Sequence, residues 1–203
     1  MISVIDYGAG NLQSVVKAFQ YIGADICVTS DPEELKQADA AVLPGVGAFG
    51  DSMKCMKQSH LVNPVLDFIE SGKPFFGICL GLQLLFEGSE ESPGVSGLGV
   101  FRGTIRKIPA ETGLKIPHIG WNSLELREQD GIFQGLEPNP YVYFVHSYYL
   151  AAEQPEIVSA VTQYGIRIDA AVHHGSVTAT QFHPEKSGKT GLQMLRNFIR
   201  LVG

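Results

Sequence analysis

Short apolar runs alternate with amphipathic segments over the first 86 residues, and this alternation limits the possible folds more than any other feature of the chain. Segment 12–22, for example, places Val15, Phe19 and Ile22 on one helical face. Strands that are joined through helices run parallel, and the helices cover both faces of the sheet. We expect strands at 2–5, 25–28, 40–43 and 75–78, and helices at 12–22, from Asp31, at 61–69 and at 80–86.

The pattern changes after about Glu87. Residues 90–99 are rich in Gly, Ser and Glu and are expected to form a loop, and the chain beyond them reads as short strands separated by turns. No repeat or linker interrupts it, so we expect one α/β domain over 1–203, with an open, mostly parallel sheet, helices on both faces and an antiparallel-rich second half. The later expected elements are strands at 100–108, 119–126, 141–145, 157–161, 166–173 and 177–182, and a helix at 191–202.

The bulk composition excludes several classes of protein. The net charge is −6 and no run of Lys and Arg occurs, so we expect no nucleic-acid or anionic-membrane partner. None of the cysteines Cys27, Cys55 and Cys79 belongs to a CxxC pair, which argues against a disulfide framework or a structural zinc site and favours a reducing cytoplasm. The N-terminus lacks the basic region of a signal peptide, and no apolar stretch approaches the roughly 20 residues of a membrane span.

Residues 75–86 carry the strongest chemical signal. A buried strand runs into Gly77-Ile78-Cys79-Leu80-Gly81 and a helix follows at once, which is the pattern of a nucleophile elbow with cysteine in place of serine. The tight turn requires glycine on both sides, and the helix N-terminus favours a thiolate. The backbone N–H of Leu80 would point to a developing oxyanion. The plainer alternative is a buried apolar cysteine, which is the interpretation that we favour for Cys27 and Cys55.

A thiolate that cleaves an amide also needs a proton donor for the leaving nitrogen. Of the six histidines, His183 is best placed, because it follows the strand expected at 177–182 and its side chain can face the sheet edge. Glu185 lies two residues further on and could orient the imidazole, which would complete a Cys-His-Glu triad. Taken without the cysteine elbow, a His-Pro-Glu sequence is a weak signal.

A second glycine-containing loop, 43–49, follows the third expected strand. In an open α/β sheet, ligands bind at the carboxyl ends of the strands, where this loop would lie. Gly45 and Gly47 would let backbone N–H groups turn toward a carbonyl oxygen. The loop is not a phosphate-binding P-loop, because no Gly-Lys-Ser/Thr follows it, and a plain strand-to-helix turn remains the alternative.

Taken together, these motifs resemble those of the class I, triad-type glutamine amidotransferases. The resemblance runs end to end, and it is closest to the family of glutamine amidotransferase subunits of imidazole glycerol phosphate synthase. The segments that carry it are DYGAGNL at 6–12, LPGVGAF at 43–49, GICLGLQLLFEGSEE at 77–91, PHIGWN at 117–122, YFVHSYY at 143–149 and QFHPEKSG at 181–188.

The resemblance implies a role for each matching residue. Cys79 would attack the glutamine carboxamide and form a glutamyl thioester, while His183 relays protons and Glu185 orients it. The N–H of Leu80 would hold the oxyanion together with a second N–H from Gly45-Val46, which a backbone flip would bring into place. The residues implied in binding L-glutamine are Gly45, Gln83, Glu87, Ser147 and Tyr148.

The resemblance also implies a partner, a (β/α)₈-barrel cyclase subunit. In histidine biosynthesis that partner would take the ammonia and make imidazole glycerol phosphate and AICAR. No cofactor or metal is implied. Because ammonium is not a nucleophile, a shielded path for ammonia is expected. If Gly45-Val46 points a carbonyl into the oxyanion site at rest, hydrolysis should also be slow until the partner binds its own substrate. The residues implied at the interface are Asn11, Trp121, Tyr143 and Lys186.

Plainer interpretations remain for several of these residues. Gln83 and Glu87 are four apart and could be a solvated helix face, Trp121 could be a core aromatic, and Asn11 could simply cap a helix. Three other functions also remain open. They are an amidotransferase of another synthase, a free-standing cysteine hydrolase, and a non-catalytic subunit that has kept the fold.

Overall fold

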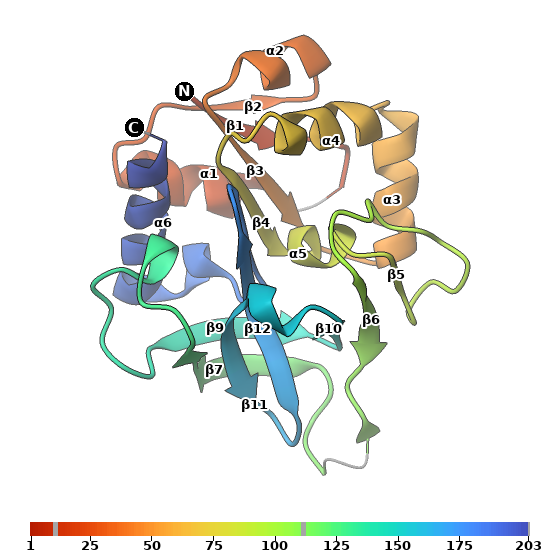
Figure 1. Cartoon of the computed structure of the whole chain (residues 1–203), viewed down its shortest axis with the longest axis vertical. Helices are drawn as coiled ribbons and strands as arrows, with labels where there is room; N and C mark the ends of the chain where they lie inside the picture. The colour runs from red at the N-terminus through yellow and green to blue at the C-terminus, as the bar shows by residue number, and fades with distance from the viewer. Residues whose placement is uncertain (10–11, 111–112, 203) are drawn as a thin grey trace.

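The computed structural model describes residues 1–9, 12–110 and 113–202, which form a large mixed sheet and a separate two-stranded ribbon (Figure 1). At one end of the large sheet, five neighbouring strands run parallel, as the alternation of strands and helices predicted. In spatial order these strands are β2 (Ile26–Thr29), β1 (Ile2–Ile5), β3 (Ala40–Gly45), β4 (Phe75–Cys79) and β13 (Val177–Thr180).

The second half of the chain extends this sheet with mainly antiparallel strands, so the predicted fold class is confirmed. β13 joins the two parts, because it is parallel to β4 on one side and antiparallel to β12 on the other. The added strands are β12 (Arg167–His174), β10 (Tyr148–Ala152), β6 (Gly103–Lys107), β5 (Gly88–Ser89), β11 (Val158–Gln163) and β8 (Glu125–Leu126), and the ribbon consists of β7 (His118–Ser123) and β9 (Tyr141–His146).

Helices cover both faces of the parallel strands (Figure 1). On one face lie α1 (Leu12–Tyr21) and α6 (Gly188–Leu201), which pack Phe19 and Phe198 edge to face. On the opposite face lie α2 (Pro32–Gln37), α3 (Phe49–Gln58), α4 (Val62–Glu70) and α5 (Leu80–Leu84). The short 3₁₀ turns are η2 (Gly131–Phe133), η3 (Pro155–Ile157) and η4 (Pro184–Lys186).

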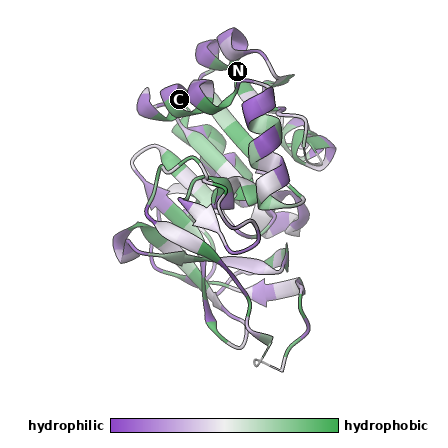
Figure 2. Ribbon diagram, turned by 90° about the vertical axis from the view of Figure 1, so that its right-hand side faces the viewer, coloured by the Kyte–Doolittle hydropathy of each residue, from purple (hydrophilic) through white to green (hydrophobic). Residues whose placement is uncertain are grey.

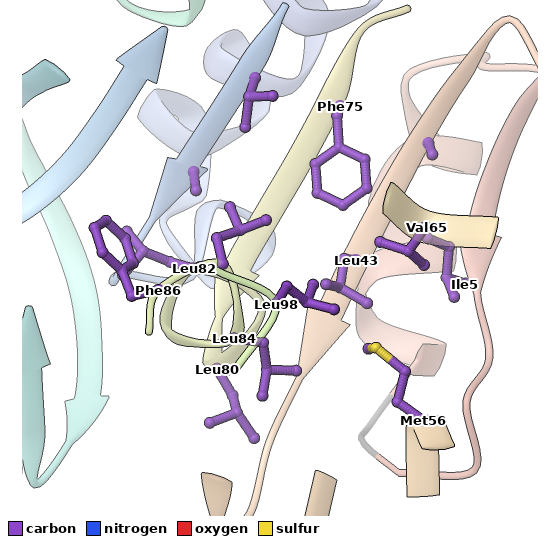
Figure 3. Close-up of a cluster of buried hydrophobic side chains, with 14 of the residues drawn as sticks. Ile5, Leu43, Met56, Val65, Phe75, Leu80, Leu82, Leu84, Phe86 and Leu98 are labelled. Atoms are coloured by element: carbon purple, nitrogen blue, oxygen red, sulfur yellow. The ribbon is translucent and has the colours of Figure 1, made fainter. Parts of the chain in front are cut away.

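The strands divide their side chains between two cores. Phe75 points into the core beneath α3, α4 and α5, whereas the next residue, Phe76, points into the core beneath α1 and α6. Figure 3 shows part of the first core, in which Leu43, Phe75 and Val65 lie close together. The central strands are mainly green in Figure 2, as expected for strands that are buried on both faces.

Three elements differ from the sequence prediction. Helix α3 was not predicted, because its apolar residues Phe49, Met53 and Met56 follow directly on a glycine-rich loop and are diluted by polar neighbours. Strand β10 was not predicted, because only the part of the aromatic run that ends at Val145 was interpreted as a strand. The strand expected at 119–126 is two strands, β7 and β8, which belong to different sheets.

The turn between β4 and α5 has the tight geometry that the glycine spacing predicted. Cys79 adopts φ 56°, a left-handed conformation that is uncommon for a residue with a side chain. A Cβ on Gly81 would lie 1.9 Å from the carbonyl oxygen of Leu43, and a Cβ on Gly77 would lie 2.9 Å from the carbonyl oxygen of Gly81. Both contacts are with backbone atoms that cannot move aside, so only glycine fits at either position.

We predict that Gly81→Ala destabilises the protein by about 3 kcal/mol or more, because the added methyl group must push helix α5 away from strand β3. Gly88→Ala is the matched control, since a Cβ there meets its nearest neighbour at an ordinary 3.5 Å. Urea unfolding followed by circular dichroism measures both. Equal free energies of unfolding for the two variants would show that the close approach of Gly81 to β3 does not constrain the turn.

Candidate active site

Cys79 stands at the carboxyl end of β4, where the sharp turn lifts its side chain out of the sheet. The residue is 7% exposed and lines a cavity of about 500 Å³. Cys27 and Cys55 are half-buried and do not line this cavity. Of the three cysteines, the structure therefore places only Cys79 at a site that a small ligand can enter.

His183 reaches the same cavity from the neighbouring strand. Thr180 of β13 lies opposite Ile78 of β4, so the chain beyond both strands emerges at the same sheet edge. The backbone of His183 is held on both sides, because its N–H donates to the carbonyl oxygen of Tyr143 at 2.9 Å and its own carbonyl oxygen accepts from the Ser187 hydroxyl at 2.6 Å. The imidazole is therefore positioned by β9 as well as by β13.

Glu185, in the 3₁₀ turn η4, fixes the orientation of the imidazole. Its Oε1 lies 2.8 Å from Nδ1 of His183, and both side chains are 3% exposed. This contact assigns the Nδ1 proton to the bond with Glu185 and directs Nε2 away from the carboxylate. Nε2 is buried and, within the described residues, has no partner in hydrogen-bonding geometry, which leaves it available for proton transfer.

The charge state of His183 follows from these neighbours. Burial lowers its pKa, but the Cys79 sulfur and the Glu185 carboxylate act more strongly in the opposite direction and raise the pKa to about 10. The ring is therefore an imidazolium at neutral pH. An imidazolium next to a thiol stabilises the thiolate and can give a proton to a leaving nitrogen, as the predicted Cys-His-Glu triad requires.

Most of the predicted site residues meet at this cavity. Its wall is built by separate parts of the chain: the loop after β3, the turn from β4 into α5, the loop after β5, the segment before β7, the β9–β10 turn and the residues around η4. Whether each of these residues has the predicted role stays a prediction. The predicted residues that line the cavity are Cys79, His183, Val46, Leu80, Gln83, Ser147, Tyr148 and Lys186.

The expected position of Glu87 needs correction. Its carboxylate accepts a hydrogen bond from the Gly103 N–H at 2.9 Å, at the start of β6, and the residue does not line the cavity. Glu91 lines it instead, and its Oε2 accepts from the Phe49 N–H at the start of α3 at 2.8 Å. Sequence reasoning missed Glu91 because it lies in the segment interpreted as a loop and because the helix that it caps was not predicted.

Gly45 lies directly behind the cavity and does not line it. It is opposite Cys79 in the register of β3 and β4, and a Cβ on it would lie 2.8 Å from both the Leu80 Cβ and the Tyr7 hydroxyl oxygen. The next two residues, Val46 and Gly47, do line the cavity. Gly45 is therefore needed for the close approach of this loop to the turn at Cys79 and Leu80. The role of Val46 and Leu80 in binding an oxyanion stays a prediction.

An apolar surface adjoins the cavity on the β7–β9 ribbon. Trp121 is 55% exposed and packs against Tyr143 at a ring separation of 6.1 Å, which contradicts the alternative that Trp121 belongs to a core. Ile119 and Tyr141 are exposed on the same ribbon, and Lys186 is exposed at the cavity. Asn11, the fourth predicted interface residue, lies outside the described residues.

A buried histidine pair, which sequence reasoning did not single out, lies beside the cavity. Nδ1 of His118 is 3.0 Å from Nε2 of His146, and Nδ1 of His146 is 2.9 Å from the carbonyl oxygen of Tyr148. Burial lowers the pKa of His118 to about 4 and that of His146 to about 3, so both rings are neutral at pH 7. The pairing depends on the register of β7 with β9, in which His118 lies opposite His146.

A metal-binding cluster and a membrane-spanning helix are both absent from the described part of the chain. Residues 1–9, 12–110 and 113–202 contain no group of three or more His, Cys, Asp or Glu side chains arranged to hold a metal ion. Within the same ranges, no helix has the length and apolar character needed to cross a membrane.

The sequence and the fold both correspond to a known class of enzyme. The model of the family "Glutamine amidotransferase class-I" matches residues 3–202, and the chain belongs to this family. Solved structures agree on the fold. PurLQS from Thermotoga maritima superposes with a TM-score of 0.78 at 18% identity, covering 100% of this chain and 98% of that one. A structure described as a glutamine amidotransferase gives 0.77 at 21% identity, covering 100% and 98%.

Relatives with about 50% sequence identity to this chain are subunits of one synthase. The imidazole glycerol phosphate synthase subunit HisH of Methanothermobacter thermautotrophicus is 52% identical over 202 residues, which cover 100% of this chain and 99% of that protein. The HisH subunit of Caldanaerobacter subterraneus subsp. tengcongensis is 48% identical over 202 residues, covering 100% and 98%. The chain is thus similar over its whole length to the glutamine amidotransferase subunit of one synthase.

We predict that acid destabilises the protein through the histidine pair. Because burial lowers both pKa values below the unfolded value of about 6.5, the folded state binds fewer protons, and stability is lost as the pH falls from about 6.5 toward about 4. Replacing His146 by Gln removes one of these groups. Between pH 6.5 and pH 5, the wild type should lose about 1.5 kcal/mol more than His146→Gln.

Urea unfolding at the two pH values measures this difference. His60→Gln, at an exposed position, controls for the loss of a histidine as such. If wild type and His146→Gln lose the same stability on acidification, the buried pair is not the source of acid sensitivity.

Proposed function

We propose that this chain is the glutaminase subunit of an imidazole glycerol phosphate synthase, and that Cys79 is its nucleophile. The observation that carries the proposal is that Cys79 and His183 line one cavity, while Glu185 bonds to the imidazole and helps to hold it protonated. The full-length similarity to HisH subunits supports the choice of synthase over the other amidotransferases that the sequence left open.

The proposed chemistry begins with the Cys79 thiolate. It attacks the side-chain carboxamide carbon of L-glutamine, and the carbonyl oxygen becomes an oxyanion that the N–H groups of Leu80 and Val46 stabilise. His183 gives its proton to the nitrogen as the C–N bond breaks, which releases ammonia and leaves a glutamyl thioester. Water then attacks the thioester and passes a proton to the neutral His183, so that glutamate leaves and the thiolate–imidazolium pair is restored.

The cavity wall suits the polar end of glutamine. Glu91 provides a carboxylate for the α-ammonium group, a role that we now propose in place of the one expected for Glu87. Ser147 and the backbone at Tyr148 face it from the β9–β10 turn, and Gln83 closes the side near Cys79. A volume of about 500 Å³ lies within the usual range for small-molecule sites.

We further propose that the partner is the cyclase subunit, with a (β/α)₈-barrel fold, and that it docks on the ribbon surface formed by Ile119, Trp121, Tyr141 and Tyr143. Exposed apolar residues that adjoin a site are typical of an interface. Ammonia released beneath such an interface would reach the partner without being protonated in bulk water. The chain would act as one domain, since β13 from its second half completes the parallel sheet of its first half.

The free thiol that this chemistry needs fits a reducing compartment, and we propose the cytoplasm as the location. The three cysteines are free in the structure.

Cys79→Ala tests the proposal directly. The variant, purified with the cyclase partner, should lose glutamine-dependent formation of imidazole glycerol phosphate, by at least about 10³-fold, because no nucleophile remains. Added ammonium salt should restore the reaction to the wild-type level at the same ammonium concentration, because the partner's site is intact. Cys55→Ala is the matched control and should keep glutamine-dependent activity.

Two outcomes would contradict the proposal. Glutamine-dependent activity that survives in Cys79→Ala would remove Cys79 from the mechanism. The second outcome is that the chain hydrolyses glutamine fully but passes no ammonia to the cyclase, although the cyclase uses added ammonium. The chain would then be an amidohydrolase of another system.

A further inference from the structure

Gln181 has contacts that the triad mechanism leaves unexplained. The residue follows β13 directly and its side chain is completely buried. Burying an amide costs free energy unless its donors and acceptors form hydrogen bonds. Its Nε2 lies 3.7 Å from the Cys79 sulfur, within hydrogen-bonding distance for sulfur. Its Oε1 lies 3.0 Å from Nε2 of Gln83.

One backbone carbonyl fixes which end of each amide faces which neighbour. Nε2 of Gln83 lies 3.1 Å from the carbonyl oxygen of Tyr148, which can only accept. Gln83 must therefore present its NH₂ group there, and the same group donates to Gln181, whose contacting atom must be Oε1. The NH₂ group of Gln181 is then left facing the Cys79 sulfur. Rotating the Gln83 amide by 180° would place oxygens in contact, and rotating the Gln181 amide would bring two NH₂ groups together; both contacts are unfavourable.

The histidine pair reinforces this orientation. Because the carbonyl oxygen of Tyr148 also faces Nδ1 of His146, that nitrogen must carry the proton, and Nε2 of His146 must accept from Nδ1 of His118. A second proton on His146 would occupy the nitrogen that accepts from His118 and would break this order, but burial lowers the pKa of both rings. The carbonyl that orients the two glutamines is thus itself held by a buried, neutral network.

We propose that Gln181 is a catalytic residue that donates a hydrogen bond to the Cys79 sulfur when the sulfur is negatively charged. Together with the imidazolium of His183, it holds the thiolate at two points in the resting enzyme. It acts again when the thioester is hydrolysed, because the sulfur recovers its negative charge as the C–S bond breaks. The inference rests on the proposed role of Cys79 as nucleophile.

The test uses two substitutions that remove the donor to the sulfur in different ways. Gln181→Met keeps an unbranched side chain of similar length and removes the donor. Gln181→Glu keeps an oxygen to accept from Gln83 but turns an acceptor toward the sulfur. Gln193→Met is the matched control, since Gln193 is half-buried on α6 and bonds only to Asn197 among the described residues.

The first readout is the rate at which iodoacetamide alkylates Cys79 in the native chain at pH 7, followed by peptide mass spectrometry. It needs neither glutamine nor a partner, and Cys27 and Cys55 serve as references in the same molecule. A donor to a charged group is worth about 10- to 100-fold in the thiol–thiolate equilibrium, and the higher nucleophilicity of a more basic thiolate offsets about half of this on a logarithmic scale. Gln181→Met should therefore alkylate slower by about 3- to 10-fold, Gln181→Glu more slowly still, and Gln193→Met at the wild-type rate.

The second readout is glutamine hydrolysis with the cyclase partner. Gln181→Glu keeps the bond that positions Gln83, so kcat should fall while KM for glutamine stays near the wild-type value. A residue that only packs the core would not produce this separation. Cys79 alkylation at the wild-type rate in both folded variants would overturn the inference while leaving the test of Cys79→Ala unaffected.

A measurement on the wild type keeps the inference testable if either variant fails to fold. In the ¹⁵N-labelled native chain, the side-chain NH₂ protons of Gln181 should move downfield as the pH is raised through the range in which the alkylation rate of Cys79 rises. The NH₂ protons of Gln193 should not move. The absence of any shift at Gln181 would show that its amide does not bond to the sulfur.

Discussion

The close approach of α5 to β3 is the constraint on which the rest of the site depends. Gly81 packs so tightly against the Leu43 carbonyl that no side chain fits between them, and this contact holds Cys79 in a left-handed conformation. Backbone strain of this kind costs of order 1–3 kcal/mol and persists only where the surroundings enforce it. Here the two cores on either side of β3 and β4 provide that enforcement, and the result is a thiol raised above the sheet edge.

Electrostatics then separates the buried histidines into two kinds. His183 lies between the Cys79 sulfur and the Glu185 carboxylate, and its pKa is raised despite burial. His118 and His146 have each other and a backbone carbonyl as neighbours, and burial lowers both pKa values. A charged imidazole suits proton transfer, whereas neutral imidazoles can orient other groups through directed hydrogen bonds. One fold thus keeps one buried histidine charged and two others neutral.

The sequence revealed the parts of the site that are local in the chain. Gly77, Cys79 and Gly81 share one turn, and His183 and Glu185 lie two residues apart, so their spacing alone carried information. The parallel strands were also predictable, since each is a short apolar run. The position of Glu91 was not, because it depends on a loop folding back on the start of α3. Gln181 and the histidine pair were not found either, since their partners come from β4, α5 and the β7–β9 register, which only tertiary structure brings together.

The central claim is that Cys79 is activated by His183 and attacks the side-chain carbonyl of glutamine. The most direct measurement is covalent trapping with a glutamine analogue that carries a chloroketone in place of the carboxamide, followed by peptide mass spectrometry of the native chain. The account predicts one label per chain, on Cys79, with protection by excess L-glutamine and much slower labelling in His183→Asn. Labelling spread over Cys27 and Cys55, or labelling of Cys79 that glutamine does not slow, would contradict it.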